Sequence, residues 1–174
     1  NVSVINEIII ENGAVLTVDG AITCTDANNI VIRDGGQLIH RNNGVKATIE
    51  REIVGYGTTN GGWYTISSPL MENTKLSDVE GLMSGDYDMY RYEEPTSLWQ
   101  NAKDASNYFN DMEMGRGYLY ANRNDVTLSF SGELNNNKVS YYMTKTEDDA
   151  LSGFHLIGNP FTHDIYKGEG AAID

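Results

Sequence analysis

Residues 8 to 18 read IIIENGAVLTV, and residues 30 to 40 read IVIRDGGQLIH. The two stretches align at an offset of 22, which places Ile8 opposite Ile30 and an Asn-Gly turn opposite an Asp-Gly turn. Each stretch therefore contains a short β-branched strand, a turn and a second strand. A repeat of this length that holds several short strands is typical of a parallel β-solenoid, in which each coil stacks on the one before it.

A pair of β-hairpins is the alternative, because Asn-Gly and Asp-Gly also favour tight hairpin turns. The register favours the solenoid, since the isoleucines of one stretch would stack in ladders on those of the other. The segment AITCT at 21 to 25 supplies a third strand and buries Cys24 as a small apolar residue. Two coils are too few to be stable alone, so we predict a solenoid stub over residues 1 to 55 that packs against a neighbouring unit.

Well-separated β segments follow the turn-rich stretch YGTTNGG at 56 to 62. Short strands with turns between them indicate an antiparallel β-sandwich with a jelly-roll-like arrangement. We therefore expect an all-β chain with this sandwich over residues 56 to 174, in which KLSDVEGLM at 75 to 83 forms a short helix or turn. The expected strands are 63–70, 87–94, 116–122, 125–134, 138–144 and 154–161.

One phrase occurs twice in the second unit, as GWYTISSPL at 62 to 70 and as GFHLIGNPF at 153 to 161. Each copy has a glycine, an aromatic residue, an isoleucine, two small residues and then a proline. Proline cannot donate to a strand ladder, so Pro69 and Pro160 should end or edge their strands in the same way. We expect two structurally equivalent strands, and chance reuse of common β-strand vocabulary is the alternative.

The chain is acidic, with 25 Asp and Glu against 12 Lys and Arg and a formal net charge of -13. This charge repels phosphate backbones and anionic lipids, so we expect neither nucleic acid nor a membrane surface as a partner. No run approaches the roughly 18 apolar residues of a membrane span, and the first residues lack a signal-peptide pattern. The many Gly, Tyr, Asn and Thr residues favour the mature part of an exported β protein over a cytosolic one.

Several segments in fixed order carry a resemblance to a known kind of module. IVIRDGGQLIH, VKATIEREI, GGWYTISSPL, GRGYLYAN and FHLIGNPFT resemble a β-rich module of secreted and surface proteins of Bacteroidetes, between about Ile30 and Thr162. Such modules stand in adhesin-like or protease-associated chains that resemble type IX secretion cargo. The resemblance implies export and a non-catalytic role. Chains of this type continue past GNPF, so it also implies a fragment of a longer chain, truncated at its C-terminus.

No catalytic motif is present, because the sequence contains no GxSxG, no HExxH and no phosphate-binding P-loop. His40, His155 and His163 are too dispersed for a zinc site of recognisable spacing. Carboxylates crowd residues 86 to 113 and could meet as the acid pair of a glycosidase. Solvated acidic surface explains them at least as well, so we predict that the chain is not an enzyme.

Aromatic residues are the best candidates for ligand binding. Trp99 and Tyr108, which we expect in loops, and Tyr118 offer flat rings that suit stacking on a sugar or contact with a protein. Asp86 and Asp88 offer the oxygen ligands that calcium prefers, without a fixed loop spacing. We expect no other cofactor.

These observations together predict a non-enzymatic structural or adhesive module of a secreted or cell-surface bacterial protein. Its expected partners are neighbouring domains of the same parent chain and a host or bacterial surface glycan or protein. The alternative is a carbohydrate-binding module of a larger secreted enzyme.

Overall fold

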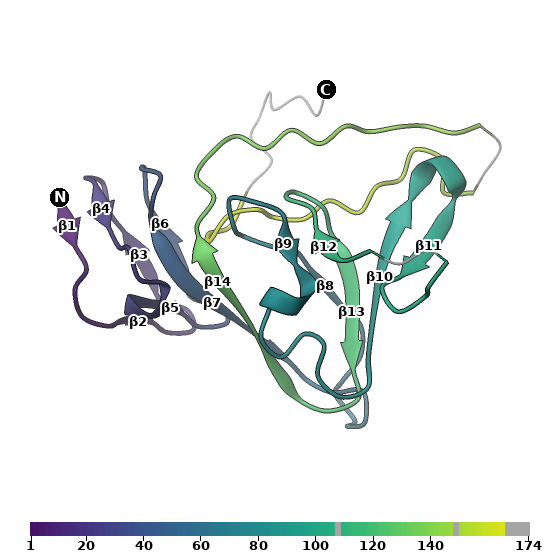
Figure 1. Cartoon of the computed structure of the whole chain (residues 1–174), viewed down its shortest axis with the longest axis horizontal. Coiled ribbons are helices and arrows are strands. Elements are labelled where there is room, and N and C mark those ends of the chain that lie inside the picture. The colour runs from purple at the N-terminus through teal and green to yellow at the C-terminus, as the bar shows by residue number, and fades with distance from the viewer. Residues whose placement is uncertain (107–108, 148–149, 166–174) are drawn as a thin grey trace.

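The computed structural model describes residues 1–106, 109–147 and 150–165. In these residues the chain is all-β, as predicted, with several sheets and short 3-10 helices but no α-helix (Figure 1). The segment predicted as a helix or turn at 75 to 83 forms the 3-10 helix η2 (Leu76–Asp78) and a turn at 81–83, and no α-helix. The other 3-10 helices are η1 (Ala27–Asn29) and η3 (Glu94–Thr96).

The repeated stretches form two stacked layers of strands. Ile8 pairs with Ile30 and Leu16 pairs with Leu38, both in parallel register, so the register expected from the sequence is observed and the hairpin pairing is not. Gly13 and Gly35 take positive φ angles of 76° and 81° at the turns, a conformation that glycine adopts without steric cost. The first layer contains β1 (Val2–Ser3), β2 (Ile8–Ile10) and β3 (Val15–Thr17), and the second contains β4 (Ile22–Thr23), β5 (Ile30–Ile32) and β6 (Gln37–Ile39).

A mixed four-stranded sheet extends from these layers in the order β14-β7-β5-β2. Strand β7 (Lys46–Ile53) pairs in parallel with β5 and in antiparallel with β14 (Val126–Glu133), from Lys46 opposite Glu133 to Ile53 opposite Val126. Strand β14 belongs to the predicted second unit, and β7 belongs to the first. One sheet therefore crosses the predicted boundary, and the division into two units stays a prediction.

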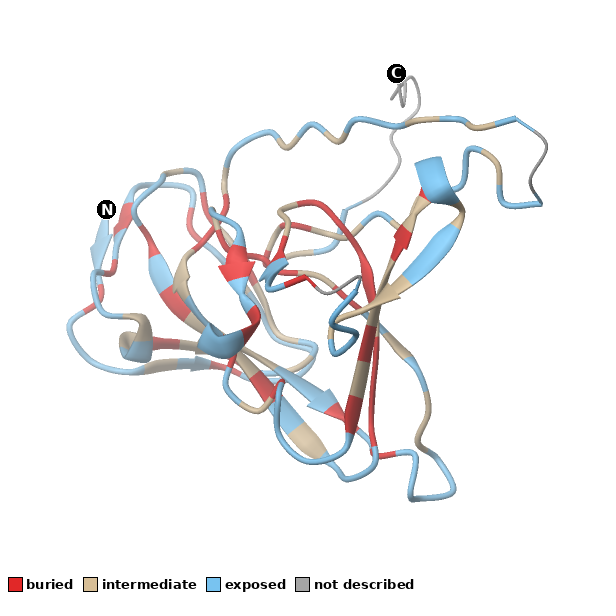
Figure 2. Cartoon of the chain, turned by 45° about the vertical axis from the view of Figure 1, so that its right-hand side comes forward, coloured by how far each residue is buried: buried red, intermediate tan, exposed pale blue. Residues whose placement is uncertain are grey.

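A second four-stranded sheet is antiparallel throughout and has the order β11-β10-β13-β8. Buried positions run along the central strands of both larger sheets, whereas the first layer is mostly exposed (Figure 2). Cys24 is fully buried, as predicted, and burial raises the pKa of its thiol. The strands are β8 (Tyr64–Ile66), β10 (Tyr87–Glu93), β11 (Leu98–Asn101) and β13 (Tyr118–Asn122), and a separate pair joins β9 (Thr74–Lys75) to β12 (Asp111–Met112).

After β14 the chain runs out along one side of the molecule and returns beneath itself (Figure 1). The strands predicted at 138–144 and 154–161 are wrong, because neither segment joins a sheet. Thr144 N donates to the imidazole of His155 rather than to a strand, and Ile157 makes only an isolated bridge with Arg116.

The two copies of the repeated phrase are not equivalent strands, which corrects the prediction. Strand β8 lies in the first copy, and the second copy contains no strand. The copies nevertheless contact each other, since Ser67 Oγ donates to the backbone carbonyl of Asn159 at 2.8 Å. Pro69 and Pro160 are both buried beside this contact.

Candidate functional site

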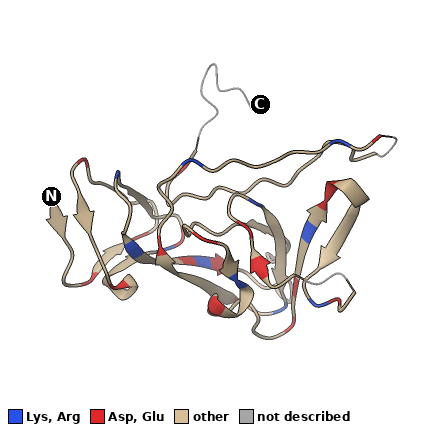
Figure 3. Cartoon of the chain, turned by 45° about the horizontal axis from the view of Figure 1, so that its top comes forward, with Lys and Arg blue, Asp and Glu red and all other residues tan. Residues whose placement is uncertain are grey.

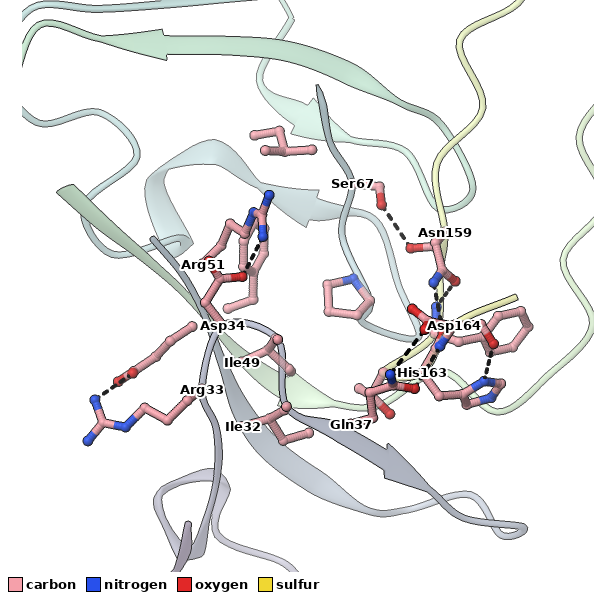
Figure 4. Close-up of a pocket in the computed structure, with 18 of the residues that line it drawn as sticks. Ile32, Arg33, Asp34, Gln37, Ile49, Arg51, Ser67, Asn159, His163 and Asp164 are labelled. Carbon is pink, nitrogen blue, oxygen red and sulfur yellow. Dashed lines mark hydrogen bonds and ion pairs between the residues drawn. The ribbon is translucent and has the colours of Figure 1, made fainter. Parts of the chain in front are cut away.

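A groove of about 330 Å³ lies where the repeated phrases meet the first large sheet (Figure 4). Ile32, Ile49 and Phe130 from β5, β7 and β14 contribute its apolar lining. Two ion pairs line one side, Arg33 with Glu50 at 2.8 Å and Arg51 with Asp34. These charges neutralise each other within the chain.

The opposite side of this groove holds the returning chain in place. Gln37 and Asp164 exchange two hydrogen bonds of 3.1 Å, one of them from the backbone N–H of Asp164. Thr162 Oγ1 donates to the carbonyl of Leu38 at 2.7 Å, and Leu38 N donates to the carbonyl of Thr162. Because these polar groups hydrogen-bond to one another, we call this groove a seam: along it, residues 162–164 are held against β6.

A second groove, of about 530 Å³, is built around Arg116, and we call it the Arg116 groove. The side chain of Arg116 is only 7% exposed. Its guanidinium donates to the carbonyl of Tyr92 at 2.6 Å, to Glu93 Oε1 at 2.7 Å and to Glu113 Oε1 at 3.2 Å. The residues that line the groove include Tyr92, Glu93, Glu94, Glu113, Arg116, Lys138, Tyr141 and His155.

Arg91 completes a network of two arginines and two glutamates below this groove. Its Nε lies 3.0 Å from Glu93 Oε1, and its NH1 lies 3.0 Å from Glu113 Oε1. Each carboxylate therefore contacts both guanidinium groups, and the four charges cancel. Elsewhere in the fold acidic residues are in excess, and acidic and basic positions are interspersed rather than gathered on one element (Figure 3).

Aromatic side chains form one wall of the Arg116 groove. The half-buried ring of Tyr141 meets His155 edge to face with centroids 5.7 Å apart. Burial raises the pKa of Tyr141. Arg116 lowers this pKa, the carboxylates of Glu113 and Glu93 raise it, and the net shift is upward, so the hydroxyl of Tyr141 stays neutral. The hydroxyl of Tyr92 is buried, and among the described residues it is the one buried side-chain polar atom without a hydrogen-bond partner.

Glu94 fixes the loop beside this wall. It is 1% exposed, and its carboxylate accepts hydrogen bonds from the hydroxyl groups of Thr144 and Thr146 and from the backbone N–H groups of Thr146 and Gly153. Burial opposes ionisation, but these hydrogen bonds prevail and lower the pKa of Glu94 to about 2. The ionised carboxylate thus holds the segment that carries Tyr141 near the groove.

Of the three aromatic residues predicted to bind ligand, Trp99 and Tyr118 do not form one exposed surface. Trp99 lies on β11 rather than in a loop, is 44% exposed, and packs on Tyr92 with ring centroids 5.2 Å apart. Tyr118 is fully buried, its hydroxyl accepts from the N–H of Glu113 at 2.7 Å, and burial raises its pKa to about 12. Its ring therefore has no free face for a ligand. Tyr108 lies outside the described residues.

The carboxylates predicted as calcium ligands contact donors of the protein. Asp86 accepts from the hydroxyl of Tyr56 at 3.1 Å, and Asp88 lies 2.9 Å from Lys103 Nζ. In the part of the chain that the structure describes, no three His, Cys, Asp or Glu residues come together in a way that could hold a metal ion. Calcium binding at this position stays a prediction.

Sequence reasoning missed the Arg116 groove. Its two arginines and two paired glutamates come from β10 and from the turn at 113 to 116, and the pairs that join these two segments are 22 and 23 positions apart. The one available signal was an arginine between two glycines in GRGYLY at 115 to 120. This pattern indicates an unusual position for an arginine, but it does not predict which glutamates contact that arginine.

Within the described residues, no helix has the length and apolar character needed to cross a membrane. Comparisons with protein-family models, with curated proteins and with solved structures each gave no match to this chain.

Proposed function

We propose that this chain is a non-enzymatic structural or adhesive module of a larger secreted or cell-surface protein. In this interpretation the two strand layers are the coils of a β-solenoid stub, and the remaining sheets form a sandwich of jelly-roll-like character. The observation that carries the proposal is that apolar side chains of the first layer are only partly buried by the rest of the described chain.

Two pairs of equivalent residues in the two layers differ in burial, although the pair Ile10 and Ile32 is buried in both. Ile30 and Leu38 in the second layer are 0% exposed, whereas their partners Ile8 and Leu16 in the first layer are only partly buried. The second layer has neighbours on both sides, because β7 pairs with β5 and Thr162 bonds to Leu38. Among the described residues the first layer has a neighbouring layer on one side only, so this part of its apolar interior is not covered by them.

The open end also presents an edge strand. Strand β2 is the last strand of its sheet, and edge strands carry backbone groups that can pair with a further strand. Apolar side chains on the first layer are exposed as well, at Val2 (42%), Ile9 (40%) and Val15 (56%). Solenoid ends of this kind require either a cap or another coil. We infer that a further β-coil of the parent protein stacks here, which makes the chain a structural segment of a longer assembly.

Adding a coil tests the stacking. A second copy of residues 1 to 22 fused ahead of Asn1 should pair with the first layer, slow amide hydrogen exchange at Ile8–Ile10 and raise the unfolding midpoint. A fusion with the same 22 residues in scrambled order is the matched control. Unchanged exchange at Ile8–Ile10 in the ordered fusion, with both fusions monomeric, would contradict the proposed stacking.

Carbohydrate binding, as part of a larger secreted enzyme, is the second candidate function. One observation favours it: the half-exposed ring of Trp99 packs on Tyr92, and Tyr92 in turn lines the Arg116 groove. Half-exposed aromatic rings beside polar groups suit the apolar face and hydroxyl edge of a sugar. Loss of glycan binding in Trp99→Ala would support a site at that ring.

A further inference from the structure

The geometry points to the Arg116 groove as a binding site for a neutral, hydroxyl-rich ligand, namely one or two rings of an uncharged carbohydrate. The inference rests on the second candidate function, and it places the sugar in the groove rather than on Trp99. It is independent of the coil stacking at the other end of the molecule.

The charge balance of the groove selects a neutral ligand. Both guanidinium groups are already paired with Glu93 and Glu113, so neither arginine is free to bind a phosphate or carboxylate. The same pairs leave no excess carboxylate for an ammonium group, since two positive charges meet two negative ones. Glu94, which is occupied by the loop that it holds, and Lys138 also line the groove. Their opposite charges keep the balance, because Arg91, Arg116 and Lys138 then stand against Glu93, Glu94 and Glu113.

The network nevertheless has hydrogen-bonding capacity left. Glu113 is 41% exposed, and its Oε2 accepts only from Arg116, at 3.3 Å, among the described residues. One of the two acceptor positions of this oxygen is therefore left. Sugar hydroxyl groups can donate to such a carboxylate and accept from neighbouring side chains at the same time. Ion pairs that are already fixed by mutual hydrogen bonds are well suited to this, because a ligand need not pay to order them.

The wall of the groove supplies the apolar contact that a sugar ring needs. Tyr141 is half-buried and held against His155, so part of its ring remains available while its orientation is constrained. Tyr92, which is 6% exposed, also lines the groove, and its buried hydroxyl has no hydrogen-bond partner among the described residues. Buried polar groups without a partner are rare in proteins, and a ligand is one physical reason for keeping such a group.

The size of the groove agrees with this ligand class. Its volume of about 530 Å³ falls within the range of roughly 300 to 1,000 Å³ that is usual for small-molecule sites. The seam in Figure 4 is smaller and is occupied at its rim by contacts within the chain, so it is the weaker candidate.

Titration calorimetry with defined sugars tests the inference. The probes are neutral methyl glycosides of mannose, glucose and galactose together with lactose, cellobiose and xylobiose, with glucuronic acid and glucosamine as charged comparisons. We expect at least one neutral sugar to bind, and Tyr141→Ala and Glu113→Gln each to weaken that binding by roughly tenfold or more. Tyr56→Ala and Glu52→Gln, exposed residues outside the groove, should leave it unchanged.

Each other outcome overturns the inference in a distinguishable way. If Trp99→Ala abolishes binding and the two groove variants do not, carbohydrate binding stands but the groove is the wrong site. If only the charged sugars bind, the ligand class is wrong. If no sugar binds at 10 mM, on the order of the weakest useful affinity, the groove proposal and the carbohydrate function both fail. Circular dichroism of each variant ensures that lost binding is not lost folding.

Discussion

The hydroxyl of Ser67 donates a 2.8 Å hydrogen bond to the backbone carbonyl of Asn159, which joins two segments that repeat one another in sequence. The contact uses the small residues of each copy, and Gly158 lies directly against Ser67. The repeated phrase therefore acts as a joint. Its first copy enters a sheet, and its second copy anchors the returning chain to the first copy.

Gly158→Ala should destabilise the fold at this joint. An added Cβ would lie 2.3 Å from Ser67 Cβ and 2.6 Å from the carbonyl oxygen of Arg116, so backbone must move. Overpacking of this kind costs about 1–3 kcal/mol, which chemical denaturation will measure. Gly62→Ala in the first copy is the matched control, because a Cβ there meets nothing within 4 Å. Equal stability of the two variants would argue against the joint.

Truncations in the two strand layers should differ in cost. Ile30→Ala removes a fully buried side chain and should lower the free energy of unfolding by about 2–5 kcal/mol. Ile8→Ala, at the equivalent position in the open first layer, should cost clearly less because Ile8 is only partly buried. Both values come from urea denaturation. A larger loss for Ile8→Ala would mean that the first layer is not the open end.

Part of this fold was predictable from the sequence because stacked parallel strands place similar apolar residues opposite one another. Ile8 and Ile30 stack in parallel, and such stacking repeats apolar residues at a fixed offset that a sequence displays. The segment at 138–144 begins with the alternating polar and apolar residues KVSY, as a strand does, yet it joins no sheet. Alternation indicates that a segment can form a β-strand. Whether the edge of a sheet lies next to that segment depends on the whole fold, which the local sequence does not show.

The Arg116 groove lay beyond sequence reasoning for a related reason. Arg116, Glu93 and Glu113 are each ordinary surface residue types, and only tertiary packing buries the arginine between the two glutamates. Tyr118 shows the converse error. Its neighbours make it look like an exposed aromatic residue in a tyrosine-rich stretch, while β13 places it in the core.

Glu94 should make the stability of the protein depend on acid pH. Its pKa is lowered to about 2 in the folded chain, from about 4.3 in an unfolded one. The ionised carboxylate therefore stabilises the fold above about pH 4.3, and this contribution is lost as the pH falls from there toward 2. Glu94→Gln should flatten the fall in stability between pH 5 and about 2.5, measured by denaturation at each pH.

Glu52→Gln is the control for this measurement, since Glu52 is exposed on β7. It should leave the shape of the pH profile almost unchanged. A Glu94→Gln profile that falls as steeply as that of the unmodified chain would show that the hydrogen bonds from the loop at 144 to 153 do not hold the carboxylate ionised.

Tyr118→Phe should separate a core role from a binding role for this residue. The phenolic oxygen accepts the N–H of Glu113 inside the protein, so its removal leaves that N–H without its acceptor and should cost about 1–3 kcal/mol of stability. Tyr142→Phe, at a ring that is 88% exposed, should change stability by less than about 0.5 kcal/mol. Alkaline titration followed at the tyrosinate absorbance gives a second readout, because the difference between the unmodified chain and Tyr118→Phe should contain a group with a pKa of about 12. A difference spectrum that titrates near pH 10, the ordinary value for tyrosine, would place the Tyr118 hydroxyl in solvent and restore it as a candidate for binding.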